Sequence, residues 1–308
     1  HYKELLELLT NNLLVINMEH LFTVAGHTFK LLLPERYPVA EWLAPYMPFR
    51  EERRVEPLFT LEVKTCATSL LREVRQEMHR FNEEPPYLWM NDTYDTYGLS
   101  IIKDCLSSLV RTEAGYVKGC LCLPERNPGY EDMLYFNSCL KLMYVLNTTT
   151  LNTLMLHASV VIQAGNGYAF LGKSGTGKST HSQLWLRYLE GYELLNDDHP
   201  IIRLVNDEVI IYGSPWSGKT PCYKNKQARL KAVVRLEQAS ENKIIRLRGI
   251  QAYAAFSPSC SGMRWQREMA DAIHQTIVAV TEHCRLLHLK CLPDEEAARL
   301  CCQTIHER

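Results

Sequence analysis

Short runs of alternating apolar and polar residues fill the first half of the chain, which is the pattern of strands that bury one face. Residues 21–24 and 28–33 flank a turn at 25–27, an arrangement that predicts a β-hairpin. Further strand-like runs cover residues 58–63, 87–90, 97–102 and 116–123. Two stretches, 38–46 and the charged 70–81, are compatible with helices. We therefore expect an α+β, mostly antiparallel domain over residues 1–150, and this domain is the candidate for selecting a substrate.

A helical period appears in the middle of the chain. Apolar positions within residues 132–146 share one face, which predicts a helix, and the polar run 147–150 weakens it. We place the domain boundary near that run. The second domain is then expected to cover residues 151–308.

Two strands, a glycine-rich loop and a helix follow one another in the second half. Residues 157–162 and 168–171 flank a turn at 164–167, so they predict a hairpin whose second arm ends directly before Gly172. Beyond the loop, apolar and aromatic residues recur at the spacing of an amphipathic helix: His181, Leu184, Trp185, Tyr188 and Leu189. Gly191 can end this helix.

The loop matches the pattern G-x-x-x-x-G-K-[ST] of phosphate-binding loops at Gly172, Gly177, Lys178 and Ser179. Its glycines permit positive φ, so successive backbone N–H groups can converge on a phosphate at a helix N-terminus. Lys178 is expected to neutralise the β and γ phosphates, while Ser179 offers its hydroxyl to Mg²⁺. A surface turn that matches by chance is the alternative, and the flanking strand and helix disfavour it. The residues expected to bind ATP, or another nucleoside triphosphate, are Gly172, Ser174, Gly175, Thr176, Gly177, Lys178, Ser179 and Thr180.

Two adjacent carboxylates, Asp197 and Asp198, follow the next strand-like run at 192–196. One of them can hold Mg²⁺ directly or through water, and the other can accept a proton from a hydroxyl nucleophile. A solvated turn before Pro200 is the alternative interpretation. Only a short connection separates the glycine-rich loop from this run, and this favours a functional role for the two carboxylates over a solvated turn.

These features together resemble the C-terminal kinase domain of HPr kinase/phosphorylase and the HPr-kinase-like proteins, which are related in fold to ATP-dependent phosphoenolpyruvate carboxykinase. The resemblance rests on residues 157–159 (His-Ala-Ser), the hairpin into 172–179, and residues 195–198 (Leu-Asn-Asp-Asp), and it covers about the second half of the chain. It implies a P-loop-containing α/β domain with a mixed sheet. It also implies that Asp198 is the general base and that Asp197 serves the metal.

Two further positions follow the family pattern. The resemblance places His157 in the catalytic site, touching phosphate or metal; a buried structural histidine is an equally good interpretation. Residues 213–220 resemble the family's substrate-side loop, in which Lys219 can add a phosphate contact; an ordinary turn is the alternative. This loop carries Trp216 and is expected to be mobile. The family's basic, glycine-containing signature after the acidic pair is not found and the first half differs, so neither HPr as substrate nor phosphorylase activity is implied.

Composition excludes several other classes of protein. The 308 residues are 46% hydrophobic and 22% charged, as in globular domains, and the net charge of -1 provides no basic field for nucleic acid or an anionic membrane. The 11 cysteines lack the spacing of a structural zinc site. Three of them (Cys105, Cys139 and Cys284) lie in apolar helical patterns, where a reduced cysteine is a small hydrophobe.

No run of about 18 apolar residues and no signal peptide is readable. We expect a cytoplasmic protein without nucleic-acid or membrane partners, and a homo-oligomer is compatible with the sequence.

The predicted function is Mg²⁺-dependent phosphoryl transfer from ATP to a hydroxyl, either on a Ser of a protein or peptide or on a small metabolite. Lys178, His157 and Asp198 are the predicted catalytic residues. Two alternatives stay open: a non-catalytic module that senses a nucleotide or binds a partner, and carboxykinase-type chemistry on a small acid. The sequence does not identify the acceptor.

Overall fold

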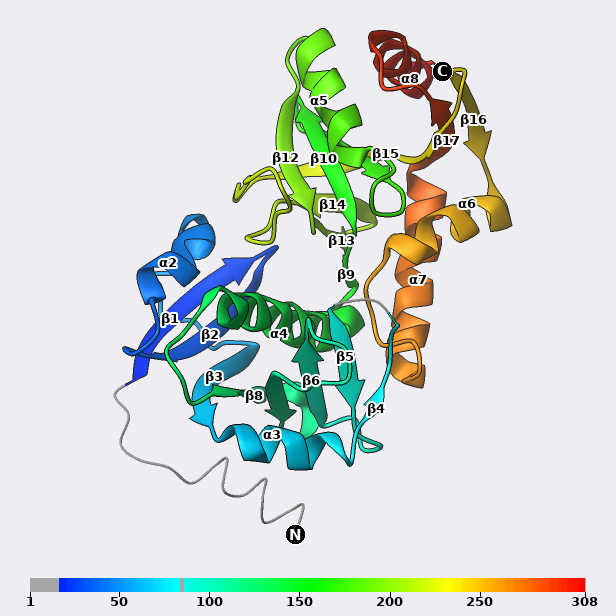
Figure 1. Ribbon diagram of the computed structural model, residues 1–308. Helices are drawn as coiled ribbons and strands as arrows, with labels where there is room; N and C mark the ends of the chain where they lie inside the picture. Colours follow the sequence, from blue (N-terminus) through cyan, green and yellow to red (C-terminus); the bar gives the residue numbers. More distant parts are fainter. Residues whose placement is uncertain (1–16, 84–85, 308) are drawn as a thin grey trace. The chain divides into compact units, whose positions relative to one another are not determined.

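The computed structural model describes residues 17–83 and 86–307. The chain forms two compact units that divide between Asn147 and Thr148, with the short segment Val24–Gly26 grouped with the second unit. Each unit is built on its own sheet (Figure 1).

The first unit contains a mixed sheet with the strand order β1-β2-β3-β8-β7-β6-β5-β4. Its strands are β1 (Asn17–Val24), β2 (His27–Pro34), β3 (Phe59–Cys66), β4 (His79–Arg80), β5 (Tyr87–Met90), β6 (Thr96–Ser100), β7 (Ser108–Thr112) and β8 (Lys118–Pro124). The pairs β2–β3 and β3–β8 are parallel, whereas the pairs from β8 through β7, β6 and β5 to β4 are antiparallel. The helices are α2 (Val39–Leu43), α3 (Thr68–Arg75) and α4 (Tyr130–Thr148).

Helices cover both faces of this first sheet. Gly119 of β8 lies against α4 so closely that a Cβ there would be 2.8 Å from the Met143 sulfur. Cys122 lies three residues after Gly119 in β8, so its side chain points to the opposite face of the sheet. There it packs in one cluster with Leu71 and Val74 of α3. The first unit therefore has its core on both sides of its sheet.

Most helices and strands predicted for the first half are present, but some differ in their bounds. The hairpin of β1 and β2, the strands β3, β5, β6 and β8, and helix α4 are present. The helix expected over 70–81 instead covers Thr68–Arg75 and is followed by the short strand β4, and β7 was not predicted. Cys105 is exposed in the connection between β6 and β7, not helical, whereas Cys139 is buried in α4. All 11 cysteines are free thiols.

The second unit contains a mixed sheet with the path β12-β10-β11-β15-β14-β13-β9, and β17 joins β15 to β16. Its strands are β9 (Thr153–Met155), β10 (Ala158–Gln163), β11 (Asn166–Leu171), β12 (Glu193–Asp198), β13 (Ile201–Val205), β14 (Glu208–Tyr212), β15 (Gln227–Gln238), β16 (Lys243–Leu247) and β17 (Arg285–Cys291). The pairs β11–β15 and β15–β17 are parallel, and the other pairs are antiparallel. The helices are α5 (Lys178–Tyr188), α6 (Gly249–Phe256), α7 (Arg267–His283) and α8 (Glu295–His306).

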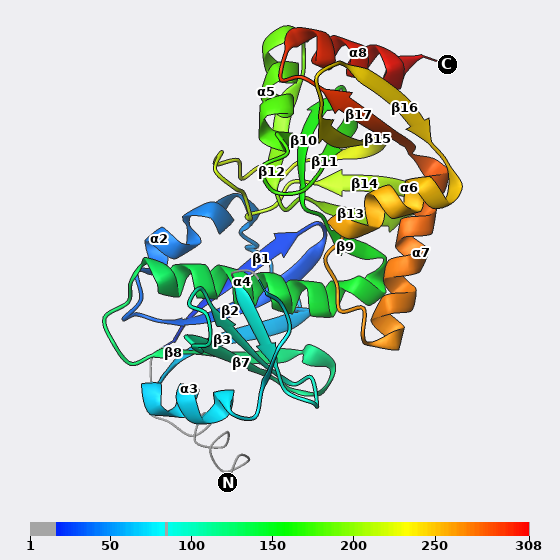
Figure 2. The same ribbon diagram turned by 45° about the vertical axis from the view of Figure 1, so that its right-hand side comes forward.

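Alternating side chains of the second sheet supply two separate cores. In β11, Ala169 and Leu171 face the cluster that includes Phe256 of α6 and Ile277 of α7. Tyr168 and Phe170, together with Trp185 of α5 and Cys301 of α8, form the cluster on the other face. Figures 1 and 2 show α5 and α8 side by side, in agreement with their contacts. The sheet thus lies between α5 with α8 and α6 with α7, which is a three-layer α/β arrangement.

Among the described residues, no helix combines the length and the apolar character needed to cross a bilayer.

Gly213 follows β14 and brings two backbone segments together beside β12. A Cβ at this position would lie 2.0 Å from the Lys224 carbonyl oxygen and 3.2 Å from that of Leu195. Because neither backbone atom can move freely, we expect Gly213→Ala to lower the free energy of unfolding by about 3 kcal/mol. Gly129→Ala is the control, since its nearest neighbour would lie 3.6 Å away. Denaturant unfolding of the full chain measures both variants, and equal losses would contradict the assignment of a close backbone approach.

Candidate functional site

A glycine-rich loop joins the end of β11 to the start of α5, as the sequence predicts. Gly175 and Gly177 have positive φ values of 80° and 101°, which glycine adopts without strain. Gly177 is the N-cap of α5, and the first backbone hydrogen bond of the helix runs from the N–H of His181 to its carbonyl at 2.8 Å. The N–H groups before His181 have no partner within the helix, so this end of α5 attracts anions.

Lys178 lies folded back over the loop that precedes it. Its Nζ donates hydrogen bonds to the carbonyl of Gly172 at 3.0 Å and to Nε2 of His157 at 2.8 Å. Partial burial lowers the pKa of Lys178, while the carboxylates of Asp198 and Asp197 act in the opposite direction. The ammonium group is thereby positioned between the loop and the acidic pair.

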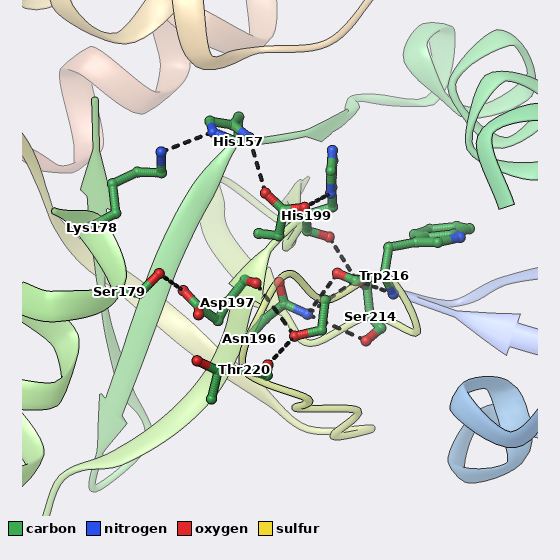
Figure 3. A network of polar contacts seen from close by, with 11 residues as sticks. His157, Lys178, Ser179, Asn196, Asp197, His199, Ser214, Trp216 and Thr220 are labelled. Atoms are coloured by element: carbon green, nitrogen blue, oxygen red, sulfur yellow. Dashed lines mark hydrogen bonds and ion pairs between the residues drawn. The ribbon is translucent and has the colours of Figure 1, made fainter. Parts of the chain in front are cut away.

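Ser179, the residue after Lys178 in α5, is hydrogen-bonded to Asp197 of β12. The Ser179 hydroxyl donates to Oδ1 of Asp197 at 2.9 Å (Figure 3). Asp197 is buried near the end of β12, where it pairs with Ser159 of β10. The interpretation of the acidic pair as a solvated turn is therefore wrong. Two hard oxygen donors in contact form the kind of site that Mg²⁺ prefers.

Asp198, the last residue of β12, is held by two imidazoles. Oδ1 lies 3.1 Å from Nδ1 of His157, and Oδ2 lies 2.9 Å from Nδ1 of His199. Burial acts to raise the pKa of Asp198, but hydrogen bonds and attraction from the two histidines outweigh it and hold that pKa well below its usual range. Its φ of 154° is rare for a residue other than glycine. The surrounding contacts thus impose an unusual backbone conformation on a charged carboxylate.

The hydrogen bonds define one tautomer of His157. An ammonium group can only donate, so Nε2 must accept from Lys178, and the ring proton then lies on Nδ1 and is donated to Asp198. Figure 3 shows the bond between Lys178 and His157. A polar chain thus runs from Lys178 through His157 to Asp198. The side chain of His157 is 40% exposed, so the alternative interpretation as a buried structural histidine does not hold.

Residues 213–220 are tied to the acidic strand by several hydrogen bonds. The N–H of Gly218 donates to the Asp197 carbonyl at 2.6 Å, and Nδ2 of Asn196 donates to the Trp216 carbonyl at 3.2 Å. The Ser214 hydroxyl donates to the His199 carbonyl at 2.6 Å. Trp216 is buried as well, so these contacts anchor the loop to the end of β12 and the residue after it.

The site collects most of the residues that the sequence singled out, with two differences. Lys219 is exposed and, within the described part of the chain, has no hydrogen bond or ion pair, so its phosphate contact stays a prediction. His199 was not singled out, although its position directly after Asp198 was a signal. Among the described residues, His157, Asp198 and His199 could also hold a metal ion, because their ligand atoms lie within 4.8 Å of one another. This nitrogen-containing set suits softer metals than the oxygen pair of Ser179 and Asp197.

A scan of known protein families gave no match, and neither did a comparison with curated protein sequences. A comparison with solved structures found similarity to the HPr(Ser) kinase/phosphatase from Coxiella burnetii. The two chains are 11% identical, and the similarity covers 49% of this chain and 92% of the other, with a TM-score of 0.29. A score this low does not place the chain in that family.

Proposed function

We propose that this protein is an ATP- and Mg²⁺-dependent phosphotransferase that acts on a hydroxyl group of a protein, a peptide or a small metabolite. The observation that carries the proposal is the convergence of four groups: Lys178 and Ser179 at the start of α5, and Asp197 and Asp198 at the end of β12. Phosphoryl transfer needs this combination of anion binding, a metal position and a nearby proton acceptor.

The triphosphate is proposed to bind at the loop and the first turn of α5. Backbone N–H groups and the Lys178 ammonium would balance its charge. Lys178 would exchange its bond to His157 for a phosphate oxygen, a movement that only its flexible side chain has to make. The oxygen donors of Ser179 and Asp197 fit Mg²⁺, which would neutralise charge on the transferring group when bound.

Asp198 and His157 are proposed to act together on the acceptor. A carboxylate whose pKa is held well below the usual range is a weak base by itself. Once Lys178 turns to phosphate, Nε2 of His157 is free to take the hydroxyl proton, while Asp198 keeps the proton on Nδ1 and stabilises the resulting imidazolium. His199 would hold the other carboxylate oxygen in place.

The same low pKa also favours a second candidate, a nucleotide-binding module without catalysis. In that case the paired histidines would keep Asp198 as a fixed charge, and no phosphoryl group would be transferred. Carboxykinase-type chemistry remains a further alternative, which competition by dicarboxylates would reveal.

The deciding experiment measures binding and transfer separately. We expect Mg²⁺-ATP to raise the thermal midpoint, because ligand at 100 times its Kd adds about 2.7 kcal/mol to stability, and EDTA to remove most of the effect. Incubation with γ-labelled ATP and a cell extract should then label an acceptor. Binding without label in any fraction would favour the non-catalytic module, and the absence of any Mg²⁺-dependent shift with four nucleoside triphosphates would refute the proposal.

A further inference from the structure

A separate cavity of about 590 Å³ opens beside the glycine-rich loop, within the second unit. Its walls are the end of the loop, the first turns of α5, the end of β15 and the connection from β17 to α8. The lining residues that matter here are Gly177, His181, Leu236, Ala239, Leu292 and Pro293. Cavities of this size accommodate small-molecule ligands.

The walls of the cavity are largely apolar and join directly to the loop. Gly175 and Thr176 belong both to the loop and to this lining. Gln238, at the end of β15, donates from Nε2 to the Gly175 carbonyl at 3.2 Å, so the strand end and the loop are linked. An apolar hollow with a few polar groups is typical of sites for heterocyclic ligands.

His181 belongs to this lining and is almost fully buried. Its side chain is 2% exposed, and its Nε2 accepts from the Trp185 indole at 3.1 Å. Burial lowers the pKa of His181 to about 4, so the neutral ring carries its proton on Nδ1. Among the described residues, that Nδ1 has no hydrogen-bond partner. A buried donor without an acceptor is costly to stability.

We propose that this cavity binds the nucleoside part of the nucleoside triphosphate, with the base against the apolar wall beside Leu236 and Ala239. The inference rests on the proposed function, because it requires phosphates at the loop. The cavity adjoins the proposed phosphate site, since the loop residues Gly175 to Gly177 border it and directly precede Lys178. The base would then contribute affinity that a triphosphate without a nucleoside lacks.

The test compares ATP with inorganic tripolyphosphate, both with Mg²⁺, by titration calorimetry on the full chain. We expect ATP to bind roughly tenfold to a hundredfold more tightly, as burial of a base predicts. Ala239→Trp, which places a large side chain in the half-buried wall, should remove most of that advantage and leave tripolyphosphate affinity within about threefold. Ala254→Trp, at an exposed position on α6 outside the lining, is the matched control and should preserve both affinities.

The outcomes separate this inference from the proposed function. Equal affinity of the unmodified protein for ATP and tripolyphosphate would overturn the nucleoside site and leave the phosphate site standing, and this comparison needs no variant. Retention of the full ATP advantage in a folded Ala239→Trp protein would also overturn it. If neither ligand binds, the proposed function fails and the inference fails with it.

Discussion

Replacing Lys178 with alanine is expected to weaken Mg²⁺-ATP binding at least about a hundredfold, the scale on which a single preorganised charged donor acts at a phosphoryl site. The reason lies in its position. The ammonium group is already folded over the loop, bonded to the Gly172 carbonyl and to His157, so it needs little rearrangement to reach a phosphate. Calorimetric titration of the purified variant measures the loss.

Lys173→Ala provides the matched control, because Lys173 belongs to the same loop but is exposed. It removes the same charge from the same segment, and we expect its affinity to stay within about threefold of the unmodified protein. Circular dichroism must show that both variants fold. If the two alanine variants lose affinity equally, the effect is one of net charge, and the specific role of Lys178 is wrong.

Replacing Asp198 with asparagine is expected to reduce phosphoryl transfer about a thousandfold while ATP affinity changes little. Asparagine keeps the shape but not the charge, and it can accept from only one of the two Nδ1–H groups that now face the carboxylate. His157 would lose the partner that defines its tautomer and stabilises its protonated form. The measurement is the initial rate of label transfer at saturating ATP, with the calorimetric Kd determined in parallel.

Asp207→Asn is the control for this second prediction. Asp207 lies in the exposed turn between β13 and β14 with a φ of 62°, a conformation that asparagine tolerates. This variant should transfer phosphate at the unmodified rate. Unchanged transfer in Asp198→Asn would remove Asp198 from the catalytic assignment, whereas loss of ATP binding in that variant would assign it to the ligand or metal site.

The local order of strand, loop and helix was readable because each part depends on neighbouring residues. The alternation at Tyr168 and Phe170 predicts a strand, and the helical period that contains Trp185 predicts α5. Tyr168, Phe170 and Trp185 are indeed all buried in the same core, on one face of the second sheet. The conformation of the loop follows from Gly175 and Gly177, which tolerate positive φ.

Some elements escaped prediction because their reasons are not local. β7 begins and ends with the polar residues Ser108 and Thr112, which are buried only because β6 and β8 flank them. β9 contains three residues, too few for any pattern, and is defined by its pairing with β13. Such strands are specified by their neighbours in the sheet.

The sequence by itself determined that a glycine-rich loop opens a helix and that an acidic pair ends a later strand, since both features are encoded in adjacent residues. Only the tertiary structure decided that Ser179 contacts Asp197 and that His157 bridges Lys178 and Asp198. It also revealed His199 as the second partner of Asp198. These contacts exist because β10 pairs with both β11 and β12, which carries distant side chains to one end of the sheet. Strand pairing of this kind depends on the packing of the whole unit, and no short stretch of sequence encodes it.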